Sequence, residues 1–137
     1  MWKNVEHIGI AVKDLNSVNE IYTKLFQKDP YKSESVDLEG VDTSFFKLGE
    51  TKIEFLSATN EDSAIAKFIE KRGEGIHHIA FEVEDIHAEL ERLQEEGFTF
   101  TRPQVSKGAD NKLVCFIHPK SANGVLVELC QEIRNDG

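Results

Sequence analysis

One stretch of this sequence occurs twice, and this repeat restricts the fold more than any other feature. Residues 75–83 read Gly-Ile-His-His-Ile-Ala-Phe-Glu-Val, and residues 5–12 read Val-Glu-His-Ile-Gly-Ile-Ala-Val. His78 aligns with His7 at an offset of 71 residues, just over half of the 137-residue chain. Self-similarity at a fixed offset is typical of a duplicated structural unit. The sequence therefore predicts two related halves.

The spacing of apolar residues predicts the elements of the first half. In residues 5–12, the large apolar residues Ile8, Ile10 and Val12 alternate with smaller or polar residues. This alternation is the pattern of a half-buried strand. Asp14 can cap a helix that continues to about Phe26. The apolar face of this helix is expected to consist of Leu15, Val18, Ile21, Tyr22 and Leu25. Three strands are expected next, at residues 31–37, 43–48 and 51–57.

A connecting helix is expected at residues 60–71, and the second half then repeats the order of the first. It is predicted to contain a strand at 76–83 and a helix that begins at Asp85 and ends before Gly97. Further strands are predicted at residues 98–102, 113–118 and 125–131, with a mobile loop at 103–111.

These elements indicate two βαβββ modules in a single domain that spans residues 1–137. The first module covers about 1–58, the connecting helix about 60–72 and the second module about 75–132. No shift in composition marks a linker between independent domains.

Composition narrows the range of partners. The formal net charge is −9, from 16 Lys plus Arg against 25 Asp plus Glu, and this argues against nucleic acid, which requires a basic face. No apolar run approaches the length of a membrane span, and the N-terminus lacks a secretory pattern, so a cytoplasmic location is expected. Cys115 and Cys130 are too few for a disulfide framework and are expected to be reduced core residues.

Two glutamates recur in the same way as the two histidines. Thr-Lys-Ile-Glu-Phe-Leu at residues 51–56 matches Val-Leu-Val-Glu-Leu-Cys at residues 125–130, so Glu54 corresponds to Glu128 at an offset of 74. The offset differs by three from that of the histidines, and a small insertion in the 107–111 loop would account for the difference. Each glutamate lies between apolar residues, and therefore on the other face of its strand.

If helices cover the apolar faces, the opposite face holds four polar residues together: His7, Glu54, His78 and Glu128. Any one of them alone is more simply explained as a solvent-facing residue, but the duplicated register favours a shared role. Two imidazoles and two carboxylates suit one divalent ion such as Zn, Co, Ni or Mn, with water completing the coordination. His77 has the wrong parity to be a ligand, and His87 and His118 are expected on a helix surface and in a loop.

This pattern resembles the vicinal oxygen chelate superfamily, which includes glyoxalases and bleomycin-resistance proteins, and within it the family of methylmalonyl-CoA epimerases. Residues 75–80, Gly-Ile-His-His-Ile-Ala, and the His-Pro-Lys that begins at His118 are among the matching stretches. The others are residues 7–12, 48–54, 61–68 and 124–129. The resemblance implies an α+β fold in which two βαβββ modules form a mixed curved sheet with helices on the outer face.

The resemblance further implies an isomerase that interconverts (2R)- and (2S)-methylmalonyl-CoA by proton abstraction at C2, through an enolate stabilised by one divalent metal ion. Glu128 is then expected to be a proton-transfer group, with Glu54 as the candidate on the opposite face. Some epimerases place a glutamate that is not a ligand on the strand that here contains Thr43, so Glu54 is equally consistent with a ligand role alone. Lys107 and Lys120 are candidate contacts for anionic groups of the substrate.

Two other functions fit the same ligand set or the same modules. One is a lyase of the glyoxalase I type that acts on the glutathione hemithioacetal, and the other is a binding protein for a small molecule without catalysis. The expected partners are an acyl-CoA substrate and a second copy of the chain in a homodimer. Binding to nucleic acid or to a membrane is not expected.

Overall fold

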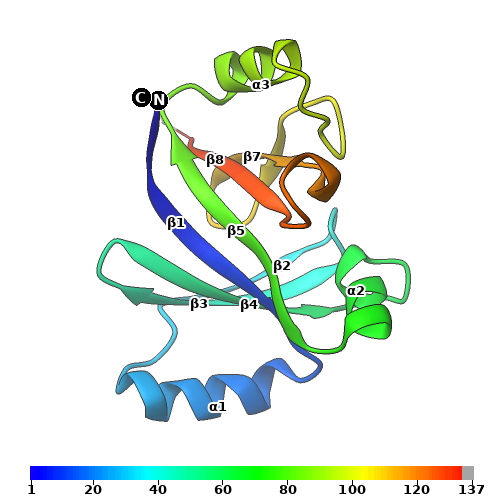
Figure 1. The fold of residues 1–137 in the computed structure, drawn as a ribbon. Coiled ribbons are helices and arrows are strands. Elements are labelled where there is room, and N and C mark those ends of the chain that lie inside the picture. The colour runs from blue at the N-terminus through cyan, green and yellow to red at the C-terminus, as the bar shows by residue number, and fades with distance from the viewer. Residues whose placement is uncertain (134–137) are drawn as a thin grey trace. The chain divides into compact units, whose positions relative to one another are not determined.

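The computed structural model describes residues 1–133, which form three α-helices, eight strands and one short 3-10 helix (Figure 1). The elements of the first half are β1 (Trp2–Ala11), α1 (Leu15–Phe26), β2 (Lys32–Val36), β3 (Val41–Leu48), β4 (Thr51–Ala58) and α2 (Ala64–Arg72). Those of the second half are β5 (Gly75–Val83), α3 (Ile86–Glu95), β6 (Ser106–Gly108), β7 (Lys112–Ile117), η1 (Pro119–Ser121) and β8 (Val127–Glu132). The order strand, helix, strand, strand, strand occurs twice, as predicted.

The chain divides into two compact units. The N-terminal unit comprises His7–His77, and the C-terminal unit comprises Met1–Glu6 together with the chain from His78 onward. The strands are ordered β2-β3-β4-β1 in the first and β5-β8-β7-β6 in the second. Strand β1 is parallel to β4 and β5 is parallel to β8, and the other neighbours within each unit are antiparallel. The predicted α+β fold with a mixed sheet is confirmed, whereas the single domain over 1–137 stays a prediction.

Helix α1 covers one face of the strands in the N-terminal unit. Its N-cap Asp14 accepts a hydrogen bond from the Ser17 backbone N–H at 3.2 Å. The residues that pack against Phe46 and Phe55 are Leu15, Val18, Tyr22 and Phe26. Ile21 and Leu25 were predicted on this face but are 51% and 64% exposed. The helix is therefore rotated, because Phe26 fills the place in the core that Leu25 was expected to take.

Helix α2 packs on the other face of the same strands. It begins at Ala64 rather than at residue 60, because the Ser63 hydroxyl caps it by accepting a hydrogen bond from the Ala66 N–H at 3.1 Å. Ile65 of α2 contacts Ala11 and Leu56. These two residues share the strand parity of His7 and Glu54, so α2 closes one end of the face that carries the polar residues.

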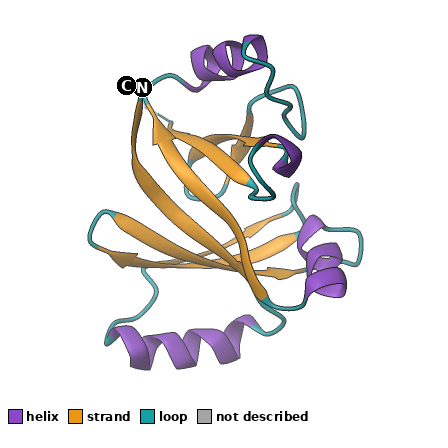
Figure 2. Cartoon of the chain, viewed as in Figure 1, coloured by secondary structure: helices purple, strands orange, loops and turns teal. Residues whose placement is uncertain are grey.

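In the C-terminal unit, α3 packs on β7 and β8 (Figure 2). Ile86, Leu90 and Leu93 contact a core cluster that includes Cys115 and Leu129. Burial raises the pKa of the Cys115 thiol to about 12, and both cysteines are free and buried, as predicted. Within residues 1–133, no helix combines the length and apolar character needed to cross a bilayer.

The region after α3 differs from the prediction. The strand expected at 98–102 is absent, and Phe100 forms only a single bridge with Ile117. The predicted loop at 103–111 instead contains β6, which pairs with β7. Two local features favour this hairpin: Asp110 and Asn111 adopt positive φ, and Gly108 packs so closely that a Cβ there would lie 2.9 Å from Val114 Cγ1.

The second half contains three residues more than the first, and this insertion does not lie where it was predicted. Phe45 pairs with Glu54 in β3 and β4, and Phe116 pairs with Glu128 in β7 and β8. The offset is therefore still 71 at the phenylalanines and becomes 74 only at the glutamates. The three extra residues lie in the connection between β7 and β8, which contains η1, and not in the 107–111 loop.

A buried carboxylate fixes the start of the chain to α3. Glu89 accepts hydrogen bonds from Trp2 Nε1 at 2.8 Å and from Arg92 Nη2 at 2.8 Å. The hydrogen bond from Arg92, with a further contribution from Trp2, lowers the pKa of Glu89 to about 2. This charge therefore contributes stability above the usual carboxyl range near pH 4.5, and the contribution is lost as the pH falls towards 2.

Replacing Glu89 by Gln is expected to lower the free energy of unfolding by about 1–2 kcal/mol at pH 7, because the amide carries no negative charge to pair with Arg92 and has one acceptor oxygen in place of two. The difference between E89Q and the original protein should shrink at pH 3. Urea denaturation at both values measures it, with the exposed Glu91 changed to Gln as control. A loss that does not depend on pH would contradict an ionised Glu89.

Candidate metal centre

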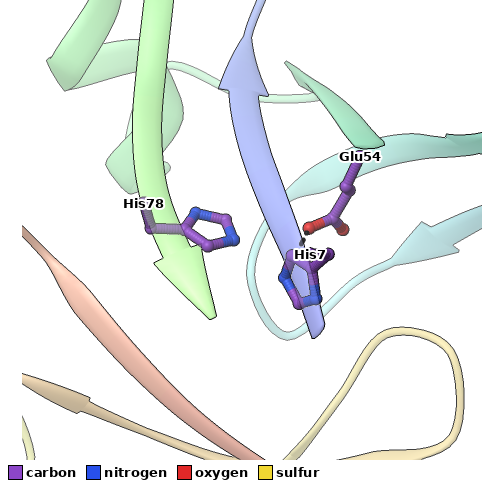
Figure 3. A group of neighbouring side chains, drawn as sticks. All are labelled: His7, Glu54 and His78. Atoms are coloured by element: carbon purple, nitrogen blue, oxygen red, sulfur yellow. Dashed lines mark ion pairs between the residues drawn. The ribbon is translucent and has the colours of Figure 1, made fainter. Parts of the chain in front are cut away.

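The N-terminal unit holds a buried histidine and glutamate side by side. His7 Nε2 lies 3.3 Å from Glu54 Oε1, as the dashed line in Figure 3 marks. The two residues are 5% and 4% exposed. Glu54 pairs with Gly9 in the parallel ladder of β1 and β4, so His7 lies two residues before the partner of Glu54 and on the same face.

The C-terminal unit holds a second pair built in the same way. His78 Nε2 lies 3.2 Å from Glu128 Oε1, and both residues are 4% exposed. Glu128 pairs with Ala80 in the parallel ladder of β5 and β8. His78 again lies two residues before that partner, so the register of the two pairs is identical.

Each pair also has a phenylalanine that the sequence analysis did not identify. Phe45 lies opposite Glu54 and presents its ring at 89° to His7, with the centroids 6.5 Å apart. Phe116 lies opposite Glu128 and makes the same contact with His78, at 89° and 6.0 Å. Both lie at the offset of 71 residues, so alignment of residues 43–47 with residues 114–118 could have found them.

The separation of the donor atoms suits ligands of one ion. Two donors each about 2.1 Å from a metal ion lie about 3.0 Å apart at a right angle and about 3.4 Å apart in a tetrahedron. The observed 3.3 and 3.2 Å fall between these values. Imidazole nitrogen and carboxylate oxygen are ligands for Zn, Co, Ni and Mn. Each pair therefore fits half of a site for a divalent transition metal.

The other candidates from the sequence lie apart from these pairs. His77 contacts Phe68 of α2 edge-on, at a centroid distance of 5.0 Å. His118 caps η1, where its Nδ1 accepts a hydrogen bond from the Lys120 backbone N–H. His87 is exposed on α3. The side chains of Lys107 and Lys120 belong to exposed residues of β6 and η1.

Thr43 is 1% exposed and carries no carboxylate. It lies on β3 opposite Leu56, on the face of Glu54, and its hydroxyl donates a hydrogen bond to the Glu34 backbone carbonyl at 3.2 Å. A hydroxyl held in this way does not replace the glutamate that some epimerases carry on this strand.

Comparison with known proteins gives matches over most of the chain. The family model described as the glyoxalase/bleomycin resistance protein/dioxygenase superfamily matches residues 6–116. The ethylmalonyl-CoA/methylmalonyl-CoA epimerase of Cereibacter sphaeroides is 42% identical, with 93% of this chain and 96% of that protein covered. The mitochondrial methylmalonyl-CoA epimerase of Dictyostelium discoideum is 40% identical, with 91% of this chain and 76% of that protein covered.

A solved structure of a methylmalonyl-CoA epimerase in complex with methylmalonyl-CoA and NH4+ is 31% identical and superposes with a TM-score of 0.92. It covers 96% of each chain. The chain therefore belongs to the glyoxalase/bleomycin resistance protein/dioxygenase superfamily and, within it, to the family of the methylmalonyl-CoA epimerases.

Proposed function

We propose that this protein is a metal-dependent epimerase that interconverts (2R)- and (2S)-methylmalonyl-CoA. The observation that carries the proposal is the pair of buried His–Glu contacts in identical register, in a chain whose relatives include epimerases. The substrate carries an acidic proton at C2, between a thioester and a carboxylate. Inversion at that carbon requires removal of the proton from one side and its return from the other.

The proposed ligands of the metal are His7, Glu54, His78 and Glu128. Each unit contributes one His–Glu pair to this proposed set, and the two pairs have the same register. The bound ion would supply positive charge that stabilises the negative charge developing on substrate oxygen atoms. Co, Ni, Zn and Mn are the candidate metals, since all four accept this mixture of nitrogen and oxygen ligands.

Glu128 is the proposed proton-transfer group from the C-terminal unit. Glu128 is 4% exposed and has Phe116 opposite it, so water has little access to it. Glu54 is the corresponding candidate from the N-terminal unit, as the sequence suggests. It is also a proposed ligand, held against His7, and a ligand role alone is equally consistent with its position.

An activity comparison separates epimerase from glyoxalase. Purified protein loaded with Co²⁺ should convert one epimer of methylmalonyl-CoA into the other and should leave the glutathione hemithioacetal of methylglyoxal unchanged. Efficient turnover of the hemithioacetal without epimerisation would support the lyase. If no divalent ion binds and neither substrate reacts, the proposal is wrong and the result favours a binding protein.

We further propose that the protein is a cytoplasmic homodimer of single-domain chains. The dimer follows from the family resemblance, and the location stays a prediction from the sequence. Light scattering of the purified protein would test the assembly, with a mass near twice 15.5 kDa expected and a mass near 15.5 kDa contradicting it.

A further inference from the structure

Strand β2 carries charged residues on its covered face, the reverse of the usual pattern. Lys32, Glu34 and Val36 are half-buried, while Ser33 and Ser35 between them are exposed. An edge strand whose only role was structural would place apolar residues on the covered face and charges in solvent. The polar groups on the covered face therefore call for a functional explanation.

The register places this pair of charges on the face of the proposed metal ligands. Glu34 lies opposite Thr43, and Lys32 lies opposite Phe45. Phe45 in turn lies opposite Glu54. Directly paired residues point to the same side of a sheet, so Glu34 and Glu54 share one face. Among the strand residues that pair in register within the N-terminal unit, they are the two carboxylates on that face.

Glu34 has no matching carboxylate in the C-terminal unit. The position opposite Thr43 holds Glu34, whereas the position opposite Val114, the counterpart of Thr43, holds Ser106. The histidines, glutamates and phenylalanines of the two units match, but this position does not. An acyl-CoA has no symmetry, so departures from symmetry on the ligand face are where contacts with one particular part of the substrate are expected.

Two interactions hold Glu34 in place. Lys32 Nζ lies 3.5 Å from Glu34 Oε1, with the two side chains 36% and 31% exposed. The Thr43 hydroxyl donates to the Glu34 carbonyl at 3.2 Å, which fixes the backbone of the edge strand at this residue. The partial exposure of the Glu34 side chain allows its carboxylate to exchange protons with solvent between turnovers.

Glu34 and Glu54 are two strands and two residues apart, which corresponds to about 12 Å between their Cα atoms at the usual spacings of a sheet. Thr43 and Phe45 of β3 lie between them on the same face. At this separation Glu34 does not share a metal ion with Glu54, so its carboxylate has a role distinct from that of the proposed ligand.

We propose that Glu34 is the second proton-transfer group of the epimerase, which leaves Glu54 as a ligand alone; this inference rests on the proposed function. Glu34 takes the C2 proton of one epimer: the C–H bond breaks, an O–H bond forms on the carboxylate, and the electron pair delocalises into the thioester carbonyl. Protonated Glu128 then donates its proton to C2 from the other side. The reverse reaction uses the same groups in the opposite order, so protons and charge balance.

The test is E34Q with Co²⁺ bound, assayed in D₂O with each epimer of methylmalonyl-CoA separately. Epimerisation should fall by about 10²–10⁴-fold, the usual contribution of a positioned acid or base. Exchange of deuterium into one epimer should continue at close to the original rate, because Glu128 can still remove and return its proton. The affinity for Co²⁺, measured by calorimetric titration, should not change, and E50Q in the exposed turn before β4 is the matched control.

The outcomes separate this inference from the proposed function. If the original protein epimerises and E34Q does so at a similar rate, Glu34 is not a base. Equal loss of epimerisation and of exchange in both epimers would indicate a structural role and would also overturn the inference. If the original protein neither epimerises nor exchanges, the proposed function itself fails. Retained exchange in one epimer alone supports Glu34, since a structural defect would not select one face.

Discussion

Replacing His78 by Ala is expected to abolish metal binding and to reduce epimerisation to background, while the fold is retained. His78 is 4% exposed, but it packs against Glu128 and Phe116 on the ligand face and belongs to none of the core clusters. Loss of one of the four proposed ligands would remove a metal–nitrogen bond that water cannot replace with the same geometry. Metal analysis after dialysis and a coupled epimerase assay measure the two losses.

Two further variants make the result of H78A interpretable. Alanine leaves the Glu128 carboxylate buried without its imidazole, which lowers stability, so H78Q is included to retain a polar side chain of similar length. H87A removes an exposed histidine of α3 and should behave as the original protein. Circular dichroism checks the fold of each variant. Full metal occupancy in folded H78A or H78Q would refute the proposed ligand set.

Replacing Glu128 by Gln is expected to lower kcat for epimerisation by at least about 100-fold, because an amide cannot accept the C2 proton. The amide is also a weaker ligand, so the affinity for the metal should fall as well. At saturating Co²⁺ the loss of kcat should persist, which separates proton transfer from metal binding. Glu132 is exposed at the end of the same strand, and E132Q should retain full activity.

The pattern of deuterium exchange should be the mirror image of that in E34Q. In E128Q, the epimer that retains exchange should be the one that loses it in E34Q, since each variant keeps the base on the other side. If E128Q with saturating Co²⁺ epimerises at the original rate, Glu128 has no role in proton transfer.

The parts of the site that follow strand parity could be predicted from the sequence. Alternation along residues 75–83 selected His78 over His77, and the structure places His78 against Glu128 and His77 against Phe68. The repeat then supplied the counterpart His7. Parity and repetition are local properties of the sequence, which is why they were sufficient for both pairs.

Features that depend on register between strands were missed. The insertion was assigned to the wrong loop because an offset between two motifs does not say where the extra residues lie. Phe45 and Phe116 look like ordinary core residues until the pairing with Glu54 and Glu128 is known.

The buried face of helix α1 was also predicted incompletely. Ile21 and Leu25 fit the helical pattern as well as Phe26, but the packing of the helix against the strands buries Phe26 and leaves the other two exposed.

Glu34 illustrates the same limit. In the sequence it is one glutamate in a polar stretch, with no counterpart in the second half that would draw attention to it. Its place opposite Thr43, on the face of Glu54, follows only from the pairing of β2 with β3 and of β3 with β4.

The central claim is that this chain moves the C2 proton of methylmalonyl-CoA with the help of a divalent ion. The most direct measurement is proton NMR of methylmalonyl-CoA in D₂O with the chelator-treated protein, before and after addition of Co²⁺. The C2 signal should remain without metal and should disappear, with appearance of the other epimer, once Co²⁺ is added. A C2 proton that persists with Co²⁺ bound would contradict the account.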